Sequence, residues 1–335
     1  MQLSGALDRF TSFDVTPTIG REFPDADLRG WLESPDSNAL LRDLAITVSQ
    51  RGVVFFRKQD GLNDGLQKTL VQRLGELSGK PRTSGLHIHP FFNAGLPLGG
   101  HDNEIDVVST EQDRTIFGTP KKFVKRQTAR GEWHTDITHE IIPSDYAMLR
   151  LIDLPKGGGG DTLWASGYEL YDRISKPYQK FLEGLTATFA QPSYDNVARQ
   201  FDHQLYTQPR GSPENVGSNF VAVHPVIRTN PVTGWKSLFA VGNHVQCINS
   251  LQKEESDSIL QWFTWLITEN HDLQVRYRWQ NRNDVALWDN RCVFHAATKD
   301  IDINDRRTGH RAMGVGERPY LDPKSTSRRE DLGLL

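Results

Sequence analysis

A histidine and an aspartate stand two positions apart in the segment GEWHTDITHE at 131–140. They are His134 and Asp136. On a β-strand, side chains at positions i and i+2 project from the same face, so an imidazole nitrogen and a carboxylate oxygen there can reach one metal ion. The H-x-D pattern also occurs often by chance, and alone it indicates only a surface histidine near an acid. Its meaning depends on further residues of matching chemistry.

A second histidine, His295, ends the apolar segment WDNRCVFH at 288–295, about 160 residues further along the chain. In a jelly roll, strands that are distant in sequence lie side by side, so His295 can supply a third ligand. Two histidines and one carboxylate form the facial triad of non-haem Fe(II) oxygenases, which keeps positions open for a cosubstrate and O2. Taken alone, His295 is equally well a core histidine whose nitrogens are hydrogen-bonded.

Two arginines, Arg307 and Arg311, lie four positions apart in DRRTGHRAMGVGERP at 305–319. Even spacing on a strand turns both toward the same side, and a guanidinium pairs bidentately with a carboxylate. The alternative is a basic surface turn with ordinary salt bridges. Thr162 follows the glycine-rich segment PKGGGGD, which matches no nucleotide-binding pattern. It either offers a hydroxyl to an acidic ligand or is a plain strand threonine.

The elements that must position these residues are mainly β. Apolar spacing predicts helices over 39–51 and 63–77 and near 167–183 and 254–270. Short strand-like runs separated by turns lie at 53–56, 146–152, 161–165, 220–228, 237–241, 273–279, 285–289 and 292–295. We expect long loops over 79–120 and a loop-rich insertion at 185–220. No linker divides the chain, so we predict one domain over 1–335, with a jelly-roll core at about 40–320 and flanking helices.

Composition excludes several classes of protein. The 335 residues include 39 Lys+Arg and 42 Asp+Glu, a net charge of −3, which argues against a nucleic-acid-binding surface. No apolar run approaches the ~18 residues of a membrane span, and MQLSGALDRF lacks the features of a signal peptide. The two cysteines, Cys247 and Cys292, are expected to be reduced core residues. We therefore expect a cytoplasmic protein without a nucleic-acid or membrane partner.

Six stretches follow one another along the chain: LHIHP at 86–90, WHTDIT at 133–138, GGDTLWASG at 159–167, HPVIRTNPVTG at 224–234, WDNR at 288–291 and RRTGHRAMGVGERP at 306–319. In this order and spacing they resemble the TauD/TfdA family of Fe(II)- and 2-oxoglutarate-dependent dioxygenases, and within it the taurine (alkylsulfonate) dioxygenases most closely. The resemblance covers roughly residues 40–320. It implies the double-stranded β-helix, the jelly-roll core of these enzymes.

The resemblance also implies roles for the metal and cosubstrate residues. His134, Asp136 and His295 are expected to hold Fe(II). The C1 carboxylate and C2 keto oxygen of 2-oxoglutarate (α-ketoglutarate) would bind the metal, with O2 as the third component. The C5 carboxylate of the cosubstrate would pair with Arg307 and with the hydroxyl of Thr162.

The remaining matches concern the prime substrate. His89 and Arg311 correspond to the pair that holds an acidic group, with Arg311 also close to the cosubstrate. Phe239 matches an aromatic residue of the pocket, and Ile137 is expected to face it. The pocket departs from the family pattern near Phe92 and Arg130, so the substrate stays open among a sulfonate such as taurine, a carboxylate and an amino acid.

The expected reaction is oxidation of an unactivated C–H bond of a small anionic substrate, with release of succinate and CO2. In some relatives the outcome is desaturation or ring closure of an amino acid or natural-product intermediate. A zinc enzyme with the same triad is disfavoured because Thr162 and Arg307 provide a dicarboxylate anchor. A non-catalytic sensor is disfavoured because no ligand is lost. Family members are often dimers or tetramers, so a homo-oligomer is an open expectation.

Other histidines have less specific readings. His87 and His89 form an H-x-H pair near His101, but a fourth ligand at zinc-like spacing is missing. His139 and Glu140 are expected to form a salt-bridged surface pair. His224 is read as a structural residue at a strand end, and His244 as either pocket-adjacent or core.

Overall fold

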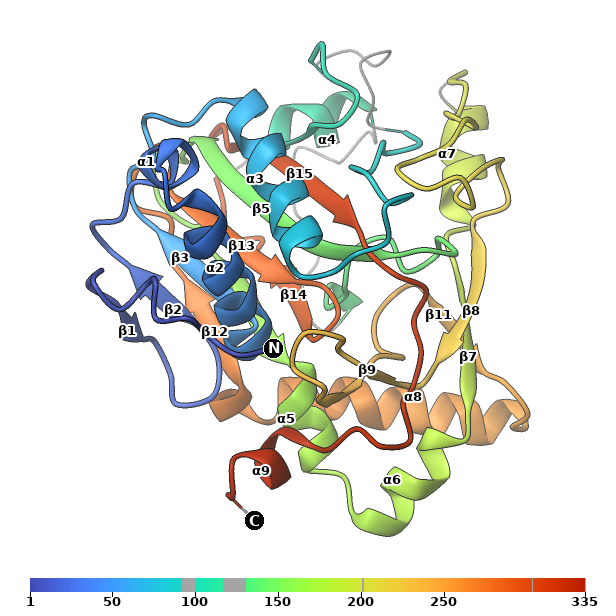
Figure 1. Ribbon diagram of the computed structural model, residues 1–335. Helices are drawn as coiled ribbons and strands as arrows, with labels where there is room; N and C mark the ends of the chain where they lie inside the picture. Colours follow the sequence, from blue (N-terminus) through green and yellow to red (C-terminus); the bar gives the residue numbers. More distant parts are fainter. Residues whose placement is uncertain (92–99, 117–130, 201, 303, 335) are drawn as a thin grey trace.

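The computed structural model describes residues 1–91, 100–116, 131–200, 202–302 and 304–334. The protein is mostly β, with helices packed around the strands (Figure 1). The strands are β1 (Phe13–Asp14), β2 (Arg21–Phe23), β3 (Val53–Phe56), β4 (Asp106–Ser109), β5 (Ser144–Asp153), β6 (Thr162–Ser166), β7 (Thr186–Ala190), β8 (Val221–Pro225), β9 (Ile227–Thr229), β10 (Lys236–Leu238), β11 (Val245–Ile248), β12 (Gln274–Tyr277), β13 (Val285–Asp289), β14 (Val293–Ala297) and β15 (Thr308–Val315). The helices are α1 (Leu28–Glu33), α2 (Ser37–Arg51), α3 (Asp64–Leu77), α4 (Thr110–Ile116), α5 (Gly167–Asp172), α6 (Lys176–Glu183), α7 (Ser193–Gln200), α8 (Lys253–Thr268) and α9 (Arg328–Asp331).

The largest sheet has seven strands in the order β1-β2-β3-β13-β5-β15-β4. All neighbouring strands in it are antiparallel except β2 and β3. Its two-residue period sorts side chains between two faces. Val54 and Leu287 belong to the apolar cluster under α2 and α3, whereas Phe55 and Trp288 belong to a cluster on the other face. This second face packs against another sheet and thereby forms the layer in which the candidate site lies.

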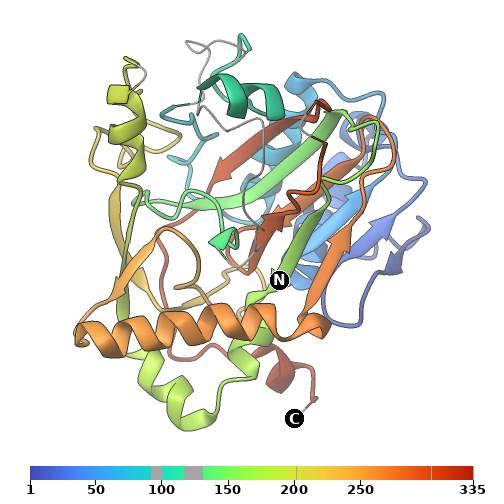
Figure 2. The same ribbon diagram turned by 180° about the vertical axis from the view of Figure 1, so that it is seen from behind.

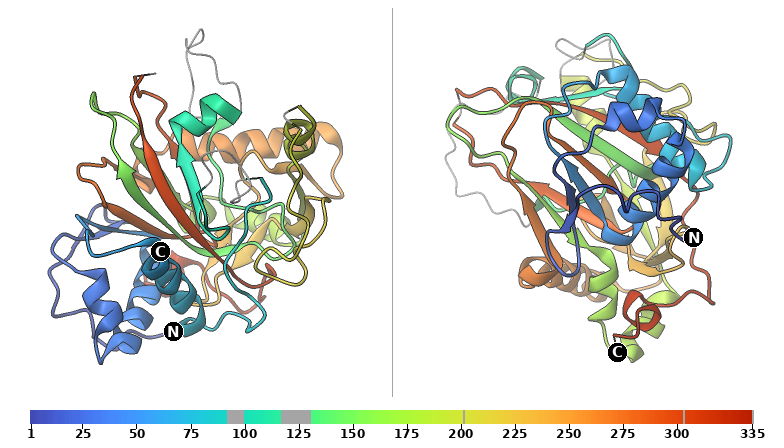
Figure 3. Two further views of the ribbon diagram at one scale, coloured as in Figure 1. Left: turned by 90° about the horizontal axis from the view of Figure 1, so that it is seen from above. Right: turned by 60° about the vertical axis from the view of Figure 1, so that its left-hand side comes forward.

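That second sheet has three strands in the order β12-β6-β14. Val275 of β12, Trp164 of β6 and Val293 of β14 join the inner cluster of the large sheet. A third sheet, β11-β7-β8, packs with α5, α6 and α8 around a separate apolar cluster. The N-terminal helices and α8 lie on opposite sides of the strands, as Figures 2 and 3 show.

Most predicted elements are present, with informative differences in their boundaries. Residues 53–56 and 285–289 are strands as predicted, and helices cover 39–51 and 63–77. The helix predicted near 167–183 is two helices, α5 and α6. Pro177 lies in the first turn of α6, where a proline is tolerated because its missing N–H would have no partner within the helix, but it cannot continue the hydrogen-bond ladder of α5. The strand predicted over 220–228 is likewise divided, into β8 and β9, next to Pro225.

Three expectations are corrected by the structure. The segment 79–120, predicted to form loops, contains β4 and α4. The short DVVS segment, with a polar residue at each end, becomes strand β4 by pairing with β15. The insertion predicted at 185–220 begins with β7, which is the central strand of the third sheet, and also holds α7. Cys292 is buried as expected, but Cys247 is exposed on β11. No helix in the described ranges combines the length and apolar character needed to cross a membrane.

Candidate active site

His134, Asp136 and His295 come together in the fold. One potential ligand atom from each lies within 4.8 Å of the others. The backbones of His134 and His295 form an isolated antiparallel bridge, with N–H···O distances of 3.0 and 2.7 Å in the two directions. The strand predicted around His134 is therefore a single bridge followed by a turn. Asp136 reaches the site from that turn rather than from strand alternation.

The chemistry of these donors fits Fe(II). The carbonyl of Glu132 lies 2.7 Å from His134 Nδ1, so this nitrogen carries the proton and Nε2 keeps its lone pair. Burial raises the pKa of Asp136, but the Arg311 guanidinium outweighs it, with His295 and His134 acting in the same direction, and the pKa lies at about 2. Burial lowers the pKa of His295 to about 3, with His134 acting in the same direction. The site thus offers one carboxylate and two imidazoles.

Two buried atoms of this set lack hydrogen-bond partners within the described part of the chain. They are Asp136 Oδ2 and His295 Nδ1. His295 Nε2 lies 3.7 Å from Asp136 Oδ1, beyond hydrogen-bond length. A buried carboxylate oxygen without a donor is costly, and a cation removes that cost. The observation supports a metal at this position.

Asn290 holds the turn that carries Asp136. Its Oδ1 accepts hydrogen bonds from the Asp136 backbone N–H at 3.2 Å, the Thr135 hydroxyl at 3.0 Å and Trp288 Nε1 at 2.9 Å. Its Nδ2 donates to Ser144 Oγ at 2.9 Å. Sequence reasoning did not assign this role, although Asn290 belongs to the WDNR stretch. A single buried amide therefore orients the acidic ligand.

The backbone behind His134 is closely packed. Gly242 has φ +107°, and a Cβ placed on it would lie 2.7 Å from the Trp133 carbonyl oxygen and 2.9 Å from His134 Cα. Only glycine permits both the conformation and this close approach. Ile137, directly after the acidic ligand, has φ +48°, which is strained for a β-branched residue. Both features indicate that the ligand-bearing turn is held in one conformation.

Arg311 projects from β15 toward the metal ligands. Its Nη1 donates to Asp136 Oδ1 at 2.7 Å and its Nη2 donates to Asp106 Oδ2 at 3.2 Å. Asp106 stands opposite Arg311 in the β4–β15 ladder. Burial raises the pKa of Asp106, and the charge of Arg311 opposes this effect. The guanidinium is thus held by two carboxylates at the edge of the cavity.

Arg307 and Thr162 occupy neighbouring segments. Arg307 precedes β15, is buried, and donates from Nε to the Gly160 carbonyl at 3.0 Å. Gly160 has φ +69°, and a Cβ there would lie 2.7 Å from Arg307 Cδ, so the glycine makes room for the side chain. Thr162 is the first residue of β6, and its hydroxyl accepts from Trp279 Nε1 at 3.1 Å. Neither Arg307 nor Thr162 lines the cavity described next.

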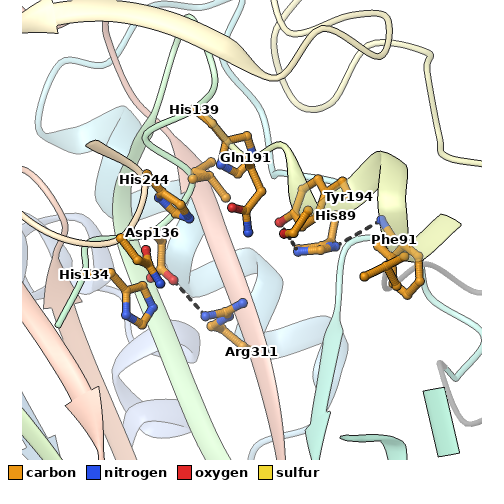
Figure 4. A pocket seen from close by; sticks show the side chains of 13 residues that line it. His89, Phe91, His134, Asp136, His139, Gln191, Tyr194, His244 and Arg311 are labelled. Atoms are coloured by element: carbon orange, nitrogen blue, oxygen red, sulfur yellow. Dashed lines mark hydrogen bonds and ion pairs between the residues drawn. The ribbon is translucent and has the colours of Figure 1, made fainter. Parts of the chain in front are cut away.

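A cavity of about 250 Å³ opens beside His134 and Asp136. Five predicted site residues line it, namely His89, His134, Asp136, Ile137 and Arg311 (Figure 4). Phe239 does not line it, contrary to prediction. Its ring lies in the core beside Phe189 and His224, at centroid distances of 5.6 and 5.9 Å, under the Arg228 guanidinium. Phe92 and Arg130 lie outside the described residues.

His89 reaches the cavity together with Tyr194. Its Nδ1 accepts a hydrogen bond from the Phe91 backbone N–H at 3.1 Å, which fixes the proton on Nε2. Nε2 lies 2.9 Å from the Tyr194 hydroxyl. Burial lowers the pKa of His89 well below its ordinary value, with His87 acting in the same direction. His89 is therefore a neutral residue that positions the tyrosine hydroxyl.

Sequence reasoning missed part of the cavity wall. Gln191, Tyr194, Asn243 and His139 line it without having been predicted to do so, whereas His244 lines it in agreement with one of its two expected positions. His139 and Glu140 are not the predicted surface pair, since both are buried. Glu140 accepts from Arg210 Nη2 at 2.9 Å, with a second contact from Nε at 2.5 Å. This ion pair anchors the segment that follows Asp136, and none of the sequence motifs indicated it.

His224 and His244 have settled structural contacts. His224 Nε2 donates toward the carbonyls of Thr138 and Glu140, at 3.0 and 3.1 Å, in agreement with the predicted role at a strand end. His244 Nδ1 lies 2.9 Å from the Thr138 hydroxyl. Both histidines thus tie neighbouring strands to the segment after the metal ligand.

Comparison with known proteins agrees with this geometry. The family model "Taurine catabolism dioxygenase TauD, TfdA family" matches residues 11–313. The alpha-ketoglutarate-dependent dioxygenase btcD of Neocamarosporium betae is 57% identical over 338 residues, which cover 98% of this chain and 96% of the relative. An alpha-ketoglutarate-dependent sulfonate dioxygenase of Saccharomyces cerevisiae is 31% identical over 310 residues, covering 92% of this chain and 68% of the relative.

A solved structure shows the same fold. The crystal structure of a taurine dioxygenase from Burkholderia xenovorans has a TM-score of 0.67 and 24% identity, and the match covers 94% of this chain and 92% of that one. Together with the family match and the 57% identical relative, the evidence leads to one assignment. The chain belongs to the TauD/TfdA family and is an α-ketoglutarate-dependent dioxygenase.

Proposed function

We propose that this dioxygenase binds Fe(II) through His134, Asp136 and His295 and uses O2 to oxidise an unactivated C–H bond of a small anionic substrate. The observation that carries the proposal is the convergence, within 4.8 Å, of two imidazoles and one buried carboxylate whose Oδ2 has no hydrogen-bond partner among the described residues. This donor set is that of the facial triad. A zinc hydrolase would have no use for the buried arginine next to the glycine turn.

We assign the far carboxylate of α-ketoglutarate to Arg307, with the Thr162 hydroxyl as a second contact. The support is the buried guanidinium, which is fixed by the Gly160 carbonyl beside the start of β6. A guanidinium in a dry site binds a carboxylate strongly because both partners are charged. The cosubstrate would then have one end on the arginine and the other on the metal.

When bound, Fe(II) and α-ketoglutarate supply the oxidising chemistry, in which O2 and the cosubstrate yield succinate, CO2 and an oxidised substrate. The chain's own residues bind and orient. Arg311 and the Tyr194 hydroxyl, backed by His89, are placed to receive an acidic group of the substrate. Ile137 contributes an apolar part of the cavity wall. Their common effect is to hold one C–H bond near the metal and to exclude water.

The decisive assay measures succinate formed from α-ketoglutarate with Fe(II), ascorbate and O2, across a panel of sulfonates, carboxylates and amino acids. Succinate formation that depends on one compound supports the proposal and names the substrate. The His134→Ala variant should lose this turnover, whereas His271→Ala, which alters an exposed histidine, should keep it. Full turnover in His134→Ala would contradict the metal assignment.

Product analysis separates hydroxylation from its alternatives. Desaturation or ring closure of an amino acid or natural-product intermediate uses the same residues and cosubstrate. A sulfonate substrate would release sulfite together with an aldehyde, because a carbon that bears both hydroxyl and sulfonate collapses in this way. The sulfonate dioxygenase of Saccharomyces cerevisiae, 31% identical, supports including sulfonates in the panel.

We further infer that the seven-stranded sheet and the β12-β6-β14 sheet form the double-stranded β-helix of this enzyme class, within one domain. Their packing through a shared apolar cluster supports the inference. A cytoplasmic location and a homo-oligomeric state remain predictions. Fluorescent tagging in cells and light scattering of the purified protein test them.

A further inference from the structure

His139 differs from the other histidines around the cavity. Its side chain is 1% exposed, and neither ring nitrogen has a hydrogen-bond partner anywhere in the described chain. By contrast, His134, His224 and His244 each have a nitrogen within 3.0 Å of an oxygen atom. Buried polar groups in proteins are almost always hydrogen-bonded, and exceptions concentrate at functional positions.

The surroundings of His139 are aromatic on one side and open to the cavity on the other. Tyr194, Phe220 and His244 approach its ring at centroid distances of 5.3, 5.8 and 5.0 Å, all near perpendicular. These contacts hold the ring without satisfying its nitrogens. In Figure 4, His139 lies with Gln191 and His244 across the cavity from Arg311. The wall opposite the guanidinium is therefore polar but uncharged.

The ring of His139 is neutral. Burial lowers its pKa to about 3, while the nearby Glu140 carboxylate acts in the opposite direction. A neutral imidazole has one N–H donor and one acceptor nitrogen. A hydroxyl group can complement both functions, and a carbonyl can accept from the donor. A second anion could also accept from this N–H, but it is a poor partner because the neutral ring carries no charge to offset the anion's desolvation.

We propose that His139 determines specificity by hydrogen bonding to a hydroxyl or carbonyl group of the prime substrate, at the end of the molecule opposite its acidic group. This inference rests on the proposed function, and it narrows the substrate class to acids that carry a second, neutral polar group. His139 touches the substrate but takes no part in metal binding. The amides of Gln191 and Asn243, on the same cavity wall, extend the polar surface.

The test compares acids that differ by one hydroxyl. The probe pairs are ethanesulfonate and 2-hydroxyethanesulfonate, butyrate and 4-hydroxybutyrate, and hexanoate and 6-hydroxyhexanoate. Binding is measured by calorimetry, under nitrogen, to protein loaded with Mn(II) and N-oxalylglycine, an unreactive analogue of α-ketoglutarate. The wild type should bind the hydroxylated member of at least one pair about tenfold more tightly, the ratio expected for one hydrogen bond.

Two variants locate the effect. His139→Phe keeps an aromatic ring against Tyr194 and Phe220 but has no polar atoms in its side chain, so the preference for the hydroxylated acid should disappear. His139→Gln restores a donor and an acceptor and should recover part of the preference. The inference is overturned if the wild type shows no preference in any pair, or if His139→Phe retains it.

The melting temperature distinguishes a substrate-binding role of His139 from a purely structural one. Because His139 makes no hydrogen bond, His139→Phe should melt at the same temperature as the wild type or higher. His224→Phe, which removes contacts to two backbone carbonyls, should melt lower. A large loss of stability in His139→Phe would mean that the residue is structural. If Mn(II) and N-oxalylglycine do not bind the wild type, the proposed function itself fails, whereas normal binding without hydroxyl preference defeats only this inference.

Discussion

Replacing Asn290 by alanine tests how the acidic metal ligand is held in place. The amide oxygen of Asn290 accepts from the Asp136 backbone N–H, from the Thr135 hydroxyl and from Trp288 Nε1. The Thr135 hydroxyl has a second acceptor, the backbone carbonyl of residue 290, at 2.8 Å. The variant therefore leaves two buried N–H donors, those of Asp136 and Trp288, without an acceptor among the described residues.

Each orphaned buried donor costs about 1–3 kcal/mol, so the free energy of unfolding should fall by roughly 2–6 kcal/mol. The turn also loses the contact that orients Asp136. Loss of such a supporting contact typically lowers metal affinity by about 10–100-fold. The free energy of unfolding and the metal affinity should thus fall together, because the same amide stabilises the fold and orients Asp136.

The free energy of unfolding is measured by urea denaturation, and the metal affinity by calorimetric titration with Mn(II). Asn249→Ala is the matched control. Asn249 accepts from the Thr188 hydroxyl at 2.8 Å and donates to the Thr186 hydroxyl at 3.0 Å, at a partly exposed position away from the metal ligands. It should cost about 1 kcal/mol and leave Mn(II) affinity unchanged. An Asn290→Ala protein that binds Mn(II) as tightly as the wild type would refute the argument.

Three further predictions concern other parts of the structure. Arg307→Ala should raise the α-ketoglutarate concentration needed for half-maximal succinate formation by about 30-fold or more, because a desolvated charge pair contributes roughly 2–5 kcal/mol. Arg306 is an exposed neighbour, and Arg306→Ala should leave this concentration unchanged in the same assay. Gly242→Ala should lower both the melting temperature and Mn(II) affinity, since its Cβ would lie 2.9 Å from His134 Cα; unchanged values of both would contradict the close approach. Burial raises the pKa of Asp145 from 3.8 to about 6. Between pH 3.8 and about 6 the folded state therefore binds more protons than the unfolded state. The contribution of Asp145 to the free energy of unfolding falls by about 3 kcal/mol in total as the pH rises through this window. In urea titrations from pH 4 to 7, Asp145→Asn should gain stability relative to the wild type as pH rises; a constant difference would contradict the raised pKa.

The sequence predicted the strands that follow simple two-residue or fully apolar patterns. VVFF and VALWD were placed correctly because both faces of these strands are buried. The sequence did not predict β4, since DVVS becomes a strand only through pairing with β15. Nor did it show that the 185–220 segment starts with a central strand. Tertiary pairing decides these cases, and a local pattern does not record it.

The site divides in the same manner. The convergence of His134, Asp136 and His295 could be predicted because motif spacing and family resemblance agree on it, even though His134 forms a single bridge followed by a turn rather than a strand. Phe239 could not be placed correctly, because an aromatic side chain at that position can face either the cavity or the core. The pair His139 and Glu140 is typical of an exposed turn, and nothing local in the sequence shows that Glu140 pairs with Arg210, 70 positions away.

The cavity wall is built from two kinds of segment. One part is the turn and the strand β15 that carry His134, Asp136 and Arg311. The other part is α7, with Tyr194 and Val197, together with Gln191 just before it. Only Ala198 of α7 is fully buried. During evolution, substitutions on α7 can therefore change which molecules are accepted while the oxidising machinery stays intact. Divergence of substrates among relatives with one shared reaction is the expected result of that separation.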